Sequence, residues 1–76
     1  MREKIGEAAG KVWKKLGEAN EINVLQLPRL LREDNETTFQ ALGWLAHEGK
    51  LVYRRDKNKN FVSLTPEEKN IFRTIN

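Results

Sequence analysis

Side chains that commonly perform catalysis are scarce in this chain. Its 76 residues include no cysteine and a single histidine, His47, and Ser63 and Thr65 flank an expected strand end instead of a glycine-rich turn. His47 lies beside Glu48 near an expected helix C-terminus, where exposure and the helix dipole explain it. The sequence therefore predicts no enzyme, no catalytic residue, no cofactor and no metal site.

Positive charge is concentrated in one short segment. In "RRDKNK", Arg54, Arg55, Lys57 and Lys59 surround Asp56, so four positive charges against one negative charge give a net charge of +3. Grouped cations of this kind attract phosphate groups. Alternatively, they belong to a solvated hairpin tip whose charges keep edge strands of neighbouring molecules apart. The sequence alone does not decide between phosphate binding and a solvated hairpin tip.

Composition limits the remaining classes of partner. Lysine and arginine total 14 against 11 aspartate and glutamate, a net charge of +3, which permits nucleic-acid contact without indicating a strongly basic domain. Apolar runs are short and no signal-peptide pattern opens the chain, so we expect a cytoplasmic protein without a membrane partner. The length predicts a single domain over residues 1–76 with one small core.

An amphipathic helix is expected over residues 3–19. Its apolar face consists of Ile5, Ala9, Val12 and Leu16, spaced three or four residues apart. A second line along this helix consists of Gly6, Gly10, Trp13 and Gly17. A glycine costs roughly 1 kcal/mol relative to alanine inside a helix, and close approach of another backbone offsets that cost. This backbone belongs either to a second copy of the chain or to the last helix of the same chain.

Two further helices are expected to meet across a tight turn. A short helix over about residues 24–32 contains Pro28 near its first turn. Asp34 or Asn35 then caps a third helix that ends at Gly49.

In the last third of the chain the pattern of apolar residues changes from one typical of helices to one typical of strands. Residues 51–54 and 61–64 are rich in β-branched and aromatic side chains around the polar segment "RDKNKN", which is typical of a β-hairpin. Residues 21–23 predict a brief extra edge strand. The capping box "TPEE" then starts a last helix with proline at its first position.

This order of elements is that of a winged helix-turn-helix domain, in which the hairpin is the wing. We predict an α+β, mainly α, fold with a three-helix core, a two-stranded β-hairpin wing and a short C-terminal helix. The segments "IGEAAGKVWKKL" and "ALGWLAHEGKLVYRR" resemble a small stand-alone winged helix-turn-helix family of prokaryotes, catalogued as a domain of unknown function. The matching residues are Gly6, Gly10, Trp13, Gly43, Trp44, Leu45, Glu48, Gly49 and Lys50. The resemblance implies this fold and a homodimer.

The sequence leaves open what Trp44, on the expected third helix, contacts. With Phe39 at the centre of the buried side, Leu42 and Ala46 flank it and Trp44 lies about 140° away, facing outward. The same outer side holds Thr37, Gln40, Ala41, His47 and Glu48. Trp44 contacts DNA, a neighbouring element of the same chain, or another protein. The absence of lysine and arginine from residue 36 to residue 48 favours protein.

Two functional hypotheses follow. The first is a nucleic-acid-binding protein of the transcription-regulatory type that binds DNA weakly or without sequence specificity. Its contact residues would be Thr37, Thr38, Gln40, Arg54, Arg55, Lys57 and Lys59. The second is a protein-interaction or homodimerisation module that does not bind DNA. Its interface residues would be Gly6, Gly10, Trp13, Gly17, Ala41 and Trp44. Neither hypothesis involves a small-molecule substrate.

Overall fold

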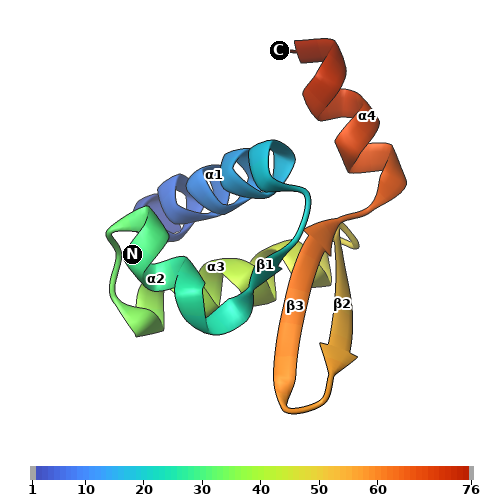
Figure 1. Cartoon of the computed structure of the whole chain (residues 1–76). Helices are drawn as coiled ribbons and strands as arrows, with labels where there is room; N and C mark the ends of the chain where they lie inside the picture. The colour runs from blue at the N-terminus through green and yellow to red at the C-terminus, as the bar shows by residue number, and fades with distance from the viewer. Residues whose placement is uncertain (1, 76) are drawn as a thin grey trace.

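The computed structural model describes the backbone of residues 2–75 and the side chains of residues 5–75. The elements are α1 (Arg2–Ala19), β1 (Ile22–Asn23), the 3₁₀ turn η1 (Val24–Gln26), α2 (Leu27–Leu31), α3 (Asn35–His47), β2 (Leu51–Asp56), β3 (Lys59–Leu64) and α4 (Pro66–Ile75). Figure 1 shows α1, α2 and α3 gathered together, the β2–β3 hairpin beside them, and α4 extending away from the end of β3. This is the predicted α+β winged helix-turn-helix fold.

The three strands form an antiparallel sheet in the order β1-β3-β2. Pairing continues as far as Asp56 and Lys59, so only Lys57 and Asn58 form the turn and the polar loop is shorter than predicted. Lys57 adopts a positive φ of 57°, a conformation found in tight two-residue hairpin turns. The wing is therefore a regular hairpin almost to its tip.

The core lies between α1, α3 and the sheet. Val12 and Leu16 of α1 are fully buried, and Leu27 of α2 and Val62 of β3 are buried with them. These side chains belong to one continuous apolar cluster. The apolar face of α1 that residue spacing predicts is thus confirmed.

The second predicted helix is divided into two parts. Residues 24–26 form a 3₁₀ turn and the α-helix begins only at Leu27. Pro28 has no N–H to donate to the Val24 carbonyl, and the Leu27 N–H donates to that carbonyl in the tighter 3₁₀ pattern. Arg32, with a φ of 57°, ends the helix in the left-handed conformation.

The sequence analysis assigned the wrong face of α3 to the core, because the helix is rotated about its axis relative to the prediction. Thr37, Thr38 and Ala41 are buried, with exposed fractions of 7%, 0% and 0%, whereas Phe39 is 41% exposed and Ala46 is exposed. The local cause is Asp34, whose carboxylate accepts the Thr37 N–H at 2.6 Å and whose carbonyl accepts the Thr38 hydroxyl at 2.8 Å. With its hydroxyl hydrogen-bonded, Thr38 can occupy the core at little cost.

Because of this rotation, three residues that the sequence predicted for a binding site cannot take part in one. Thr37 and Thr38 face the core and cannot reach a base edge, and Ala41 cannot form part of a protein interface. Gln40 and Trp44, by contrast, are exposed as predicted.

The last helix packs on one part of the glycine line of α1. A Cβ atom at Gly17 would overlap the Phe72 ring of α4. The Trp13 ring meets the same Phe72 ring edge to face, with 5.4 Å between centroids, and the Trp13 indole N–H donates to Glu68 at 2.8 Å. Gly17 therefore serves close packing within the chain. A Cβ at Gly6 or Gly10 meets no atom within 4 Å, so this contact does not explain those two glycines.

We predict that Gly17→Ala lowers stability relative to Gly43→Ala. The new methyl group forces Phe72 or α4 to move, which costs about 1–3 kcal/mol. Gly43→Ala, on α3, gains helix propensity of about 1 kcal/mol, and its Cβ meets nothing within 4 Å. Urea denaturation of both variants measures the difference in free energy of unfolding, and equal shifts in the same direction would contradict the packing described here.

Candidate nucleic-acid interface

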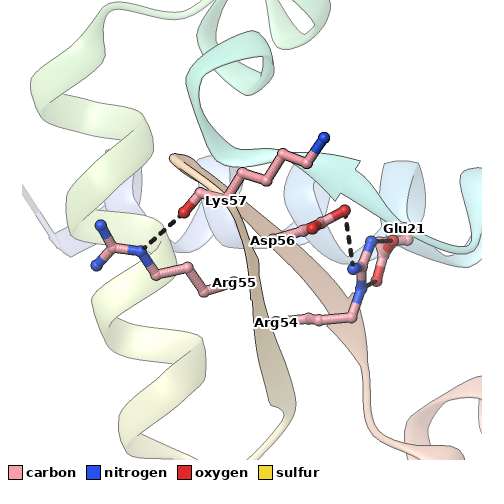
Figure 2. Close-up of polar contacts among 5 residues, drawn as sticks. All are labelled: Glu21, Arg54, Arg55, Asp56 and Lys57. Carbon is pink, nitrogen blue, oxygen red and sulfur yellow. Dashed lines mark hydrogen bonds and ion pairs between the residues drawn. The ribbon is translucent and has the colours of Figure 1, made fainter.

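The two arginines of the wing point to opposite faces of the hairpin. Figure 2 shows Arg54 leaving β2 toward Glu21 and Arg55 leaving it on the side where α3 lies. Successive residues of a strand alternate in this way. Arg54 pairs with Phe61 in register, whereas Tyr53 pairs with the buried Val62, so Tyr53 and Arg55 share the face that is directed at the core.

Arg54 is held by an ion pair with the segment before β1. Its Nη2 and Nε groups donate to the two carboxylate oxygens of Glu21 at 2.7 and 3.0 Å. Its guanidinium also lies 4.7 Å from the centre of the Phe61 ring and 3.7 Å from a carboxylate oxygen of Asp56. The hydrogen bond from Arg54 lowers the pKa of Glu21, and Glu21 in turn raises the pKa of Arg54. A phosphate could use Arg54 only in competition with this carboxylate.

The other predicted wing cations are less constrained. Arg55, Lys57 and Lys59 are exposed, and the Arg55 Nε group makes a long 3.5 Å contact with the Lys57 carbonyl. Within residues 5–75, no carboxylate forms an ion pair with any of the three. These three side chains therefore supply the positive charge that the wing presents to an anion.

The outer face of α3 is open but not basic. At about 100° per residue, the side opposite the buried residues carries Glu36, Gln40, Gly43 and His47, all of them exposed. Open space at the Cβ position of Gly43 would let a ligand backbone approach the helix closely. Of the three polar residues predicted to contact bases on this helix, only Gln40 is placed to do so.

Tyr53 is a residue of this surface that the sequence analysis did not select. It is half exposed, and partial burial raises the pKa of its hydroxyl group. Its phenol lies on the same face of the hairpin as Arg55, where a neutral hydroxyl can donate a hydrogen bond to a phosphate. The alternation of residues in "LVYRR" was the signal that pairs these two side chains.

Comparison with known proteins places this geometry in a family. Residues 1–64 match the family model described as "Winged helix-turn-helix domain (DUF2582)". The chain belongs to this winged helix-turn-helix family. It is 36% identical over 64 residues to "Uncharacterized protein MJ1608" of Methanocaldococcus jannaschii, an alignment that covers 80% of this chain and 90% of that protein.

Two solved structures share the fold of this winged helix-turn-helix protein. The solution NMR structure of protein BT2368 from Bacteroides thetaiotaomicron matches with a TM-score of 0.74 and 36% identity, over 83% of this chain and 77% of that chain. Reduced HlyU from Vibrio cholerae matches with a TM-score of 0.76 and 23% identity, over 90% and 72% of the two chains. The likeness to HlyU shows the common fold alone.

Trp44 lies on one flank of α3 in this winged helix-turn-helix domain. Its side chain is 53% exposed and lines a groove with Gly10 and Trp13 of α1 and Ile71 of α4. Three residues of the predicted protein interface, Gly10, Trp13 and Trp44, are thus brought together, while Gly17 packs on Phe72 within the chain. Neighbouring elements of the same chain thus border the groove beside Trp44, and about half of its side chain is accessible.

The described part of the chain has no feature of a metal centre or a membrane span. Among these residues, no three histidine or acidic side chains are grouped as metal ligands. None of the described helices combines the length and apolar character needed to cross a bilayer.

The Arg54–Glu21 ion pair predicts a pH dependence of stability. Because Arg54 lowers the pKa of Glu21 from its ordinary 4.5, the pair stabilises the folded state above pH 4.5 and this contribution is lost as the pH falls through the folded-state pKa. The loss of stability caused by Glu21→Gln should therefore be larger at pH 7 than at pH 3. Urea denaturation at both pH values measures it, with the exposed helix residue Glu7→Gln as control. An equal cost of Glu21→Gln at both pH values would contradict this assignment.

Proposed function

We propose that this protein binds nucleic acid weakly, as a DNA-binding domain of the regulatory type, through its wing and the outer face of α3. The observation that carries the proposal is a set of three wing cations without an ion-pair partner among the described residues: Arg55, Lys57 and Lys59. Arg55 points to the side of the hairpin where α3 lies, Lys57 is in the turn, and Lys59 lies on the opposite face. In winged helix-turn-helix proteins the helix that corresponds to α3 is the one that enters the major groove.

The charge distribution supports binding dominated by phosphate contacts. The outer face of α3 presents Gln40 and His47 but also the acidic Glu36, so few groups are available to read base edges. Three wing cations that each neutralise one phosphate give a slope of about −2.7 for log K against log salt on duplex DNA. Affinity should thus be low at physiological salt and depend little on sequence.

We predict that neutralising the wing tip abolishes most of this affinity. Lys57→Asn/Lys59→Gln removes two phosphate contacts, and asparagine tolerates the positive φ at position 57. Lys14→Gln/Lys15→Gln removes the same charge from α1, where Lys14 is exposed and Lys15 is partly buried and pairs with Glu18, and serves as the control. Fluorescence anisotropy with a mixed-sequence duplex at several salt concentrations should show a salt slope shallower by about two for the wing variant alone. Equal loss in both variants would argue against a site on the wing.

A second prediction concerns Arg54. Replacing Glu21 by glutamine removes the carboxylate that occupies Arg54 and makes a fourth cation available to phosphate. Glu21→Gln should therefore tighten duplex binding and make the salt slope steeper by about 0.9. Glu18→Gln, which removes an equal charge beside Lys15, controls for the change in net charge. If both variants tighten binding equally, Arg54 is not the group released.

A second candidate function is protein contact through the surface around Trp44. The groove that unites Trp44 with Gly10 and Trp13 is the observation in its favour. Because Trp44 lies on the α1 and α4 flank of α3, this contact and binding by the wing use different surfaces and do not exclude one another.

A further inference from the structure

A groove between α1 and α2 combines leucine side chains with lysines. Its lining consists of three lysines and a glutamate of α1 and two leucines of α2: Lys11, Lys14, Lys15, Glu18, Leu30 and Leu31. The volume is about 240 Å³, below the roughly 300–1,000 Å³ of pockets that enclose a small molecule. A space of this size suits side chains of a partner protein. The lining includes no residue of the wing, so this α1–α2 groove is separate from the proposed nucleic-acid site.

The three lysines form a stripe along α1, because they are three or four residues apart. Lys11 is already occupied, since its Nζ atom lies 2.7 Å from a carboxylate oxygen of Glu33. Lys15 lies 3.9 Å from Glu18, which is at the limit of an ion pair. Among the described residues no carboxylate pairs with Lys14. Two neighbouring cations of the stripe are therefore available to anionic groups of a ligand.

Leu30 supplies an accessible apolar surface beside these lysines. It is 47% exposed, whereas Leu31 is 7% exposed and belongs to the core. Neither α2 nor the preceding turn η1 contains an acidic residue. An exposed leucine bordered by cations is complementary to a surface that carries apolar side chains next to carboxylates.

We infer that the α1–α2 groove binds an acidic amphipathic helix of a partner protein. Such a helix places an apolar side chain on Leu30 and carboxylates opposite Lys14 and Lys15, because residues three and four apart lie on one side of a helix. A phosphate backbone fits this groove poorly. It has no apolar side chain, and Glu18 and Glu33 beside the lysines repel it. The inference goes beyond the proposed binding of nucleic acid and does not depend on it.

A designed peptide serves as the probe for this groove. It has about 18 residues of leucine, glutamate and alanine, with leucines spaced three and four apart, so that it forms an acidic amphipathic helix. A peptide of the same composition with its leucines distributed around the helix is the control. Fluorescence anisotropy of the labelled peptide, titrated with the full chain at low salt, should give a dissociation constant below about 1 mM.

Variants of the groove test both parts of the contact. Lys14→Gln/Lys15→Gln removes the two available cations and should raise the dissociation constant about tenfold, as expected for two exposed ion pairs. Leu30→Ala keeps a good helix former and should raise it at least about threefold through lost apolar contact. Leu25→Ala, at a 77% exposed leucine of η1 that does not line the groove, should bind the peptide as the wild type does.

Duplex titration of the same samples separates this inference from the proposed function. Lys57→Asn/Lys59→Gln should lose duplex affinity and keep peptide affinity, and Lys14→Gln/Lys15→Gln should do the reverse. A protein that binds the peptide but no duplex would refute the wing site and leave the groove intact.

Four results would overturn the inference. Three of them are no peptide binding up to about 1 mM, equal binding of the control peptide, and equal binding by Lys14→Gln/Lys15→Gln and the wild type. The fourth is displacement of the peptide from Lys57→Asn/Lys59→Gln by duplex DNA, which would assign the lysines of α1 to phosphate contact.

Discussion

Burial of one side of α1 holds the other elements in position. Val12 and Leu16 are fully buried in the cluster that also contains Leu27 of α2 and Val62 of β3. Because β3 is the central strand, this packing places the whole hairpin, and the buried side of α3 joins the same cluster. The cluster is small, so the chain has little apolar area to spare. It nevertheless leaves Trp44 and Ile71 about half exposed, which is the main physical reason to assign them an intermolecular role.

The cations of the wing fall into two groups, according to whether a carboxylate pairs with them. On the face that carries Phe61, Arg54 is occupied by Glu21 and lies over the aromatic ring, an arrangement that ties the hairpin to the segment before β1. On the core-directed face and at the turn, Arg55 and Lys57 have no carboxylate ion-pair partner among the described residues. One basic segment thus combines a structural ion pair with the charge proposed to meet phosphate. The net charge of the segment alone does not separate these two uses.

Local patterns predicted the elements well and their orientation less well. The face of α1 follows from spacing because its apolar residues are the ones buried. On α3 the same reasoning chose Phe39 over Thr38, since a phenylalanine is far more hydrophobic, and it failed because the Asp34 cap satisfies the threonine hydroxyl. Contacts between residues distant in sequence could not be predicted, because they leave no local pattern. Arg54 lies 33 residues from its partner Glu21. Likewise, the repeat of glycines in α1 does not show that Gly17 is the one that meets Phe72.

The central claim is that nucleic acid and a protein partner would contact different surfaces of this domain. A titration of the isotope-labelled protein with a short duplex, followed in two-dimensional ¹H–¹⁵N NMR spectra, tests it most directly. The account predicts that amide signals of Gln40, Gly43 and the Arg55–Lys59 segment shift, while the two indole signals of Trp13 and Trp44 keep their positions. Shifts of the indole signals with an unchanged wing would contradict it.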